Sequence, residues 1–109
     1  MMEDRITILT DGQTTFNTKK YNGLLDSIII DSEDKVEILI ESELGYVVFN
    51  RTEFQGTDYF AIRKRTTAKD EKLQDSPDFV KFFLNESLNI TVIGPKDSEV
   101  NLILRFQKS

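Results

Sequence analysis

The sequence predicts an all-β fold, an antiparallel β-sandwich of about eight strands. Hydrophobic and polar residues alternate with period two in short runs, and turn residues separate these runs along the whole chain. The length of 109 residues fits one domain, and 39% hydrophobic with 30% charged residues is ordinary for a folded protein. We therefore expect a single β-sandwich domain over residues 1–109 with a short N-terminal arm. A jelly roll is one way to connect the strands, whose order the alternation leaves open.

Alternation places the expected strands along the chain. It is clearest where Val36, Ile38 and Ile40 alternate with Glu37 and Glu41, because a helix would not separate these residues onto two faces. The last run follows the same rule, with apolar residues at every second position from 100 to 106. In chain order, we expect strands at residues 6–9, 25–30, 36–41, 46–49, 59–63, 79–84, 88–92 and 100–106.

Short turns separate most of these strands. Residues 94–98 read Gly-Pro-Lys-Asp-Ser, in which Gly94 tolerates positive φ and Pro95 presets a turn, so a hairpin is expected between the last two strands. Residues 31–34 and 43–45 are also short connections. Strands joined by such short loops are expected to be antiparallel neighbours.

Three segments are less regular. The run at residues 79–84 is rich in aromatic residues and fits a strand buried on both faces, although Ser76 and Pro77 would also start a short helix. Strand is favoured and the helix stays an alternative. Residues 10–22 are polar and predict a long loop or a loose hairpin arm, and residues 66–78 form a second long connection.

Composition excludes most familiar catalytic sites. The chain contains no Cys and no His, so thiolate nucleophiles, thiolate metal sites and imidazole bases are absent. We expect no enzyme activity, no catalytic residue, no cofactor and no bound metal. The 14 Lys and Arg against 19 Asp and Glu give a net charge of −5, which opposes binding to nucleic acid.

No apolar run approaches the length of a membrane span, and the acidic start of the chain does not resemble a secretory signal peptide. The sequence therefore predicts a protein made in the cytoplasm that does not enter a membrane.

Two acidic groups could carry chemistry but have simpler explanations. Asp31, Glu33 and Asp34 offer oxygen ligands for Ca²⁺, yet they lack the spacing of an EF-hand, so a solvated turn is the preferred interpretation. Glu41 and Glu43 could serve as a glycosidase carboxylate pair. A polar strand end explains that pair equally well.

Basic and aromatic residues give the candidates for binding. Residues Arg63, Lys64 and Arg65 form the densest basic cluster, followed by Lys69, and Lys19 and Lys20 form another. A charged strand edge that discourages pairing is the default interpretation, and contact with an acidic neighbour, including another copy of this chain, is the functional one.

Three tyrosines give the second class of candidate. The rings of Tyr21, Tyr46 and Tyr59 could stack on a sugar, although the absence of Trp counts against such a site.

The spacing of the strands resembles that of small β-sandwich virion structural proteins of tailed bacteriophages, a group that includes head decoration, neck and tail components. The resemblance covers residues 23–106 and is carried by the segments 23–30, 36–40, 59–63, 88–94 and 100–106. It implies a protein that assembles into symmetric rings or lattices in the virion. No functional residue is carried over from it.

The leading hypothesis is therefore a non-enzymatic virion structural protein, either a capsid decoration protein or a neck or tail adaptor. Its partners would be other virion proteins and copies of itself, reached through the N-terminal arm and the two long loops. The alternative is a β-sandwich module that binds carbohydrate or a host surface. The residues expected to bind a partner are Arg5, Phe16, Tyr21, Arg63, Arg65 and Lys69.

Overall fold

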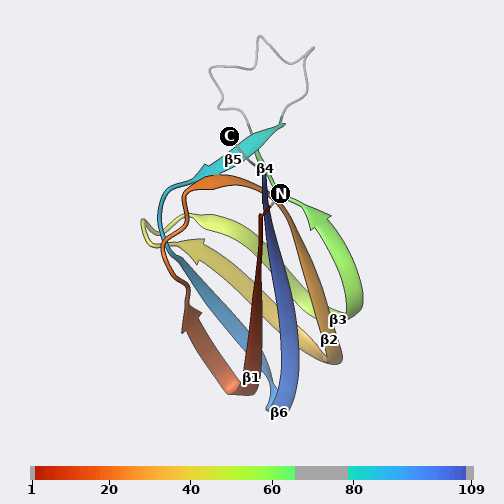
Figure 1. The fold of residues 1–109 in the computed structure, drawn as a ribbon. Coiled ribbons are helices and arrows are strands. Elements are labelled where there is room, and N and C mark those ends of the chain that lie inside the picture. The colour runs from red at the N-terminus through yellow and green to blue at the C-terminus, as the bar shows by residue number, and fades with distance from the viewer. Residues whose placement is uncertain (1, 66–78, 108–109) are drawn as a thin grey trace.

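Four long strands form the frame of the molecule in a computed structural model, which describes residues 2–65 and 79–107 (Figure 1). Two short strands complete the part that it describes, and this part contains no helix. The all-β class is confirmed. The strands are β1 (Met2–Asn17), β2 (Gly23–Ser42), β3 (Val47–Ala61), β4 (Arg63–Arg65), β5 (Phe79–Leu84) and β6 (Leu88–Gln107).

The strands pair in one antiparallel sheet. Its strand order is β1-β6-β2-β5-β4. Strand β3 also pairs with β2, so β2 has β6, β3 and β5 as partners along its length. Strand β6 lies between β1 and β2, so the first and last described strands are neighbours, and Met2 lies opposite Phe106. The sheet is open, because among the described residues β1 pairs with β6 alone.

Each long strand changes register near its middle. Pairing in β1 shifts between Thr10 and Gly12, opposite the stretch of β6 between Gly94 and Ser98. Pairing of β2 with β6 shifts after Ser32. Positive φ angles at these corners, 72° at Gly12, 97° at Gly56, 54° at Glu53 and 63° at Asp97, are typical of β-bulges. All four bends lie at one end of the molecule, which we call the bend end, at the bottom of Figure 1.

These bends correct two of the turn predictions. Residues 94–98 do not form a hairpin, because the segments on both sides continue as β6 and pair with β1 and β2 instead of with each other. Residues 31–34 likewise lie within β2. Gly, Asp and Ser favour a corner inside a strand for the same reason that they favour a turn. The third turn is confirmed: residues 43–45 join β2 to β3, and the Ser42 amide donates to the Tyr46 carbonyl at 2.9 Å.

Six of the eight predicted strand segments lie wholly in strands, although several are halves of one longer strand, while Tyr46 precedes β3 and Ile62 lies between β3 and β4. Residues 79–84 form β5, so the strand is confirmed and the short helix is wrong. Met2–Asn17 is strand, so the expected N-terminal arm and most of the loop expected at residues 10–22 are wrong. Those residues pair with β6, and their polar side chains reflect an exposed edge. The connection at residues 66–78 lies outside the described residues.

One hydrophobic core cluster draws residues from both halves of the bent strands. The alternation predicted its members well, because Ile38, Ile40, Leu102 and Leu104 are fully buried. Ile30 and Ile40 lie on opposite sides of the bend in β2, yet both belong to the same core cluster. The described residues include no helix long and apolar enough to cross a membrane.

Candidate binding cleft

A cleft of about 300 Å³ lies beside the edge strand β1. Because β1 bends at Gly12, both of its halves line the cleft, and the loop that follows the strand completes it. The side chains of this cleft are mixed, with two cations, one carboxylate, three hydroxyls and two aromatic rings. The lining residues are Asp4, Arg5, Ile6, Thr7, Phe16, Thr18, Lys19 and Tyr21.

Thr18 fixes the loop that carries two of these side chains. Its amide donates to the Leu88 carbonyl at 2.9 Å, and its Oγ1 accepts from the Leu88 amide at 2.8 Å. The Tyr21 amide donates to the Glu86 carbonyl at 3.0 Å. Lys19 therefore projects from a loop that is bonded to the chain on both sides.

Tyr21 forms the floor of the cleft. Its ring is only 2% exposed and packs on Phe106, with ring centroids 4.8 Å apart, while its hydroxyl donates to Asp4 Oδ2. Burial raises the pKa of Tyr21 well above its ordinary value, the hydrogen bond and charge of Asp4 raise it further, and Thr18 opposes them. The prediction that Tyr21 is a surface stacking ring is wrong, because the ring supports the cleft from inside the core.

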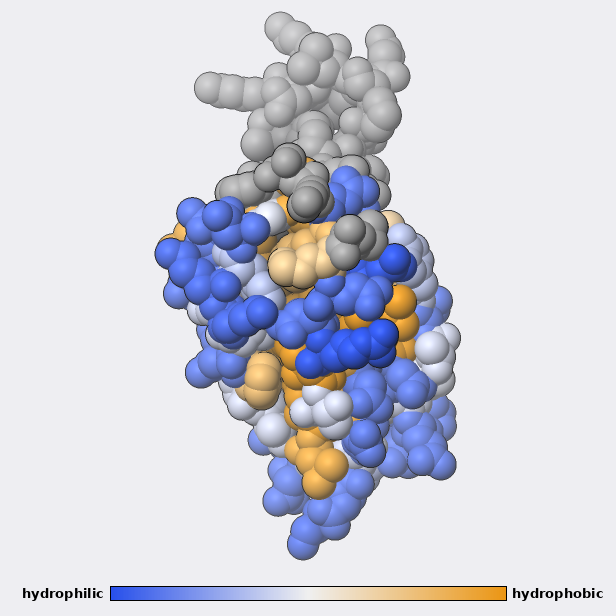
Figure 2. All heavy atoms as spheres, viewed as in Figure 1, coloured by the Kyte–Doolittle hydropathy of each residue, from blue (hydrophilic) through white to orange (hydrophobic). Residues whose placement is uncertain are grey.

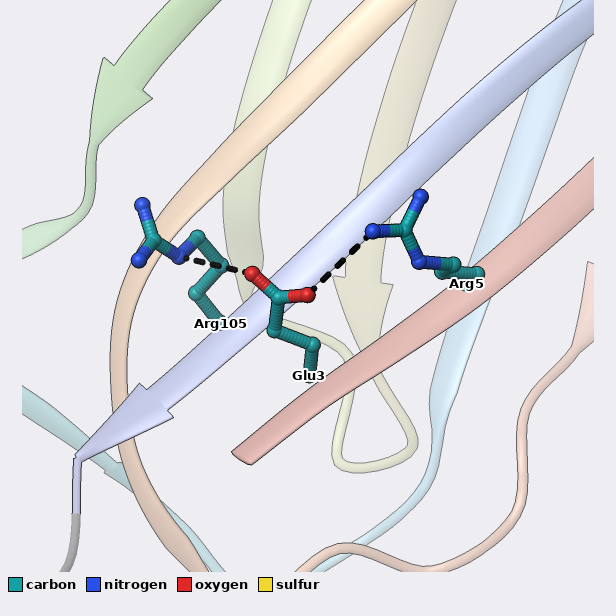
Figure 3. A network of polar contacts seen from close by, with 3 residues as sticks. All are labelled: Glu3, Arg5 and Arg105. Atoms are coloured by element: carbon teal, nitrogen blue, oxygen red, sulfur yellow. Dashed lines mark hydrogen bonds and ion pairs between the residues drawn. The ribbon is translucent and has the colours of Figure 1, made fainter. Parts of the chain in front are cut away.

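Arg5 lines the cleft and belongs to a network of three charged side chains, with Glu3 and Arg105 (Figure 3). The Glu3 carboxylate lies between two guanidinium groups, 3.4 Å from Arg5 Nη2 and 3.2 Å from Arg105 Nε. The Arg5 side chain is 73% exposed, so this ion pair contributes little to stability and leaves the cation accessible to a partner.

The cleft is suited to binding. Phe16 exposes 38% of its surface, and Lys19 Nζ lies 5.9 Å from the centroid of the Tyr21 ring. An apolar surface flanked by Arg5 and Lys19 can accept a group that is partly apolar and carries negative charge. Among the described residues, no three acidic side chains come close enough together to hold a metal ion.

The structure brings together Arg5, Phe16 and Tyr21, three of the residues predicted to bind a partner. Arg63 and Arg65 are in β4, which pairs only with β5 in the described part of the chain. Lys69 lies outside the described residues.

Sequence reasoning missed Asp4, Thr7 and Thr18 as lining residues. Thr18 is hydrogen-bonded to Leu88, 70 positions away in the chain, and no local sequence pattern predicts such a long-range pair.

The other two tyrosines lie at the surface, as predicted. Tyr59 is 51% exposed and Tyr46 is 42% exposed. Partial burial raises the pKa of Tyr46, the charge of Glu86 and a hydrogen bond to it raise the pKa further, and Ser42 opposes them. These rings do not line the cleft.

A second hollow, of about 550 Å³, lies at the bend end. Its side chains are mainly acidic and amide groups, and two of the three acids considered for Ca²⁺ border it, Asp31 and Glu33. Asp31 Oδ1 accepts a hydrogen bond from Thr57 Oγ1 at 2.6 Å. The lining residues are Asp31, Ser32, Glu33, Gln55, Gly56, Glu99 and Asn101.

Comparison with known proteins gives likeness of fold only. No family model and no curated protein matches the chain. Among solved structures, a variant of the family 29 carbohydrate-binding module CBM29-2 is 13% identical with a TM-score of 0.44, covering 93% of this chain and 70% of that one. The core of Drosophila NLP, described with pentamer formation and histone binding, is 8% identical with a TM-score of 0.45, covering 99% and 100%. Because both TM-scores are below 0.5, neither likeness carries an argument about function.

Proposed function

We propose that this chain is a non-enzymatic structural protein of a tailed-bacteriophage virion, a capsid decoration protein or a neck or tail adaptor. It acts through contacts with other virion proteins and with copies of itself. The observation that carries the proposal is the edge strand β1, which has an unpaired side among the described residues and a cleft beside it. An exposed strand edge offers backbone donors and acceptors to a neighbouring protein, and a cleft next to it takes a side chain.

The composition of β1 supports a contact role. Native proteins commonly protect edges with Lys or Pro. Strand β1 contains neither over its 16 residues, and Leu9 is 57% exposed on it. A partner that covered β1 would bury this apolar surface together with Phe16.

We also propose that the bent sheet is a two-layered jelly-roll sandwich. In support, all four long strands bend at one end, and on both sides of the bend they pair in the order β1-β6-β2-β3. One core cluster draws residues from both halves. Eight half-strands would then form two four-stranded layers, an architecture used by viral capsid proteins and also by lectins.

Reconstitution tests this function. The purified chain is mixed with the head, neck and tail proteins encoded near its gene, and binding is followed by co-sedimentation. We expect one component to bind the chain, and the double substitution Arg5→Ala with Phe16→Ala to abolish that binding. The matched control is Thr15→Ala, an exposed change on the same strand outside the cleft. A chain that stays monomeric and binds no component would reject the proposal.

A second candidate, a module that binds carbohydrate or a host surface, is favoured by the exposed rings of Tyr46 and Tyr59. Hits on a glycan array that disappear with Tyr46→Ala or Tyr59→Ala, while the Tyr→Phe variants retain them, would support this candidate over the assembly role.

A further inference from the structure

Charge is unevenly distributed along the molecule. The exposed side chains at or next to the corners of the bend end are predominantly acidic, and Lys35, Arg51 and Lys96 are the basic residues there. The acids at or next to the four corners are Asp11, Asp31, Glu33, Asp34, Glu53, Asp97 and Glu99.

Away from the bends, the cleft presents two exposed cations beside one carboxylate, that of Asp4, which accepts a hydrogen bond from the Tyr21 hydroxyl. The two cations are Arg5 and Lys19, and Lys20 is exposed next to Lys19. Gly12, at a bend, is six residues before Thr18, and six residues of strand span roughly 20 Å. Lys19 is therefore too far from the bend end to pair with its acids within one chain, and the two surfaces are complementary only between copies.

One corner of the bend end is held in shape. Ser32 Oγ donates to the Asp34 carbonyl at 2.7 Å, and Gln55 Nε2 donates to the Glu33 carbonyl at 2.9 Å. These two bonds fix the backbone of the corner while the carboxylates of Glu33 and Asp34 stay exposed. A corner ordered in advance loses less conformational entropy on binding.

We infer that the chain self-associates head to tail, with the Glu33–Asp34 corner of one copy seated at the cleft of the next. The two carboxylates would meet Arg5 and Lys19, and the contact would cover the exposed ring of Phe16. This inference rests on the proposed function and specifies the partner as a second copy of the chain. A contact between two different surfaces is heterologous, so it produces a ring if the rotation closes and a filament if it does not.

Charge reversal tests the contact in both directions. The cleft variant carries Arg5→Glu and Lys19→Glu, and the corner variant carries Glu33→Lys and Asp34→Lys. Each variant alone places like charges at the contact, so sedimentation velocity should show self-association more than about tenfold weaker than that of the unmodified chain. An equal mixture of the two should recover association, because the acidic cleft of one fits the basic corner of the other.

Salt dependence is a second test of the contact. Association of the unmodified chain should weaken as the salt concentration rises from about 20 mM to about 300 mM, because the Debye length falls to well below 10 Å.

The charge-reversal variants need a control that changes charge elsewhere. The double variant Asn50→Lys with Thr15→Lys adds positive charge at exposed positions outside both surfaces, and its association should stay within about twofold of that of the unmodified chain.

Cross-linking detects a weak contact. Because the chain has no cysteine, a disulfide between Lys19→Cys and Asp34→Cys copies can report only on the introduced pair. The mixture should form a covalent dimer that mixtures of Asn50→Cys with Asp34→Cys do not form.

The inference is overturned if the cleft and corner variants associate as the unmodified chain does. It is also overturned if the unmodified chain neither associates nor gives the specific cross-link. Neither result rejects the virion role, which is judged separately by binding to head, neck and tail proteins.

Discussion

At the scale of single residues, Tyr21 shows how one side chain combines packing with polarity. Its ring lies on Phe106 in the core, and its hydroxyl reaches Asp4 on β1. Sequence reasoning recognised an amphipathic ring but could not decide which part would face water, because exposure depends on strands distant in the chain. Tyr59, with the same chemistry, is half exposed.

Replacing Tyr21 with Phe removes the hydroxyl and keeps the ring. We expect the free energy of unfolding to fall by about 1–2 kcal/mol, because a hydrogen bond to a carboxylate is lost inside the cleft. Urea unfolding measures the change, and Tyr59→Phe should alter it by less than about 0.5 kcal/mol. Equal effects of the two substitutions would contradict the role assigned to Tyr21.

The raised pKa of Tyr21 predicts a loss of stability at high pH. The folded chain holds the phenol proton more tightly than the unfolded chain, so unfolding releases a proton once the pH exceeds the ordinary tyrosine pKa of about 10. This contribution to stability is fully present below that pH and declines above it. Urea unfolding between about pH 9 and 11 should show a steeper decline for the unmodified chain than for Tyr21→Phe. Parallel declines would show that Tyr21 is not the group responsible.

At the scale of elements, sequence predicted where the strands lie but not that four of them are long and bent. Every expected strand segment lies in a strand except at Tyr46 and Ile62, because alternation reports which side chains face the core. The corners at residues 31–34 and 94–98 carry the residues of a turn, and the same residues suit a bulge inside a continuous strand. The choice is made by pairing with β1 and β6, which depends on residues far away in the chain.

Gly94, in β6, lets side chains from β1 and β2 pack closely against its backbone at a bend. A Cβ at this position would lie 2.8 Å from Val36 Cγ1 and 3.2 Å from Thr10 Oγ1. We expect Gly94→Ala to lower the free energy of unfolding by about 1–3 kcal/mol through overpacking. Gly23→Ala is the matched control, since its Cβ would meet no atom closer than 3.7 Å and it should stay within about 0.5 kcal/mol. Urea unfolding distinguishes them, and a neutral Gly94→Ala would disprove the close approach.

At the scale of the whole molecule, the candidate cleft was only partly predictable. Arg5, Phe16 and Tyr21 were chosen as separate features of an arm and a loop, and the bend in β1 brings them to one place. Composition alone shows the net charge of −5, but the gathering of acidic residues at one end requires knowing that all four bends coincide. On the face drawn in Figure 2, hydrophobic atoms appear in a strip between hydrophilic side chains, so one face offers both apolar and charged contacts.

The position of β6 between β1 and β2 also sets the order in which the sheet can form during synthesis. The ribosome releases β1 first and β6 last of the described strands, and β6 is the only partner of β1 among them. The backbone of β1 therefore stays without its partner strand until almost the whole described chain has left the ribosome. During this interval, its unprotected backbone is open to wrong partners on both sides, a hazard that cellular chaperones limit.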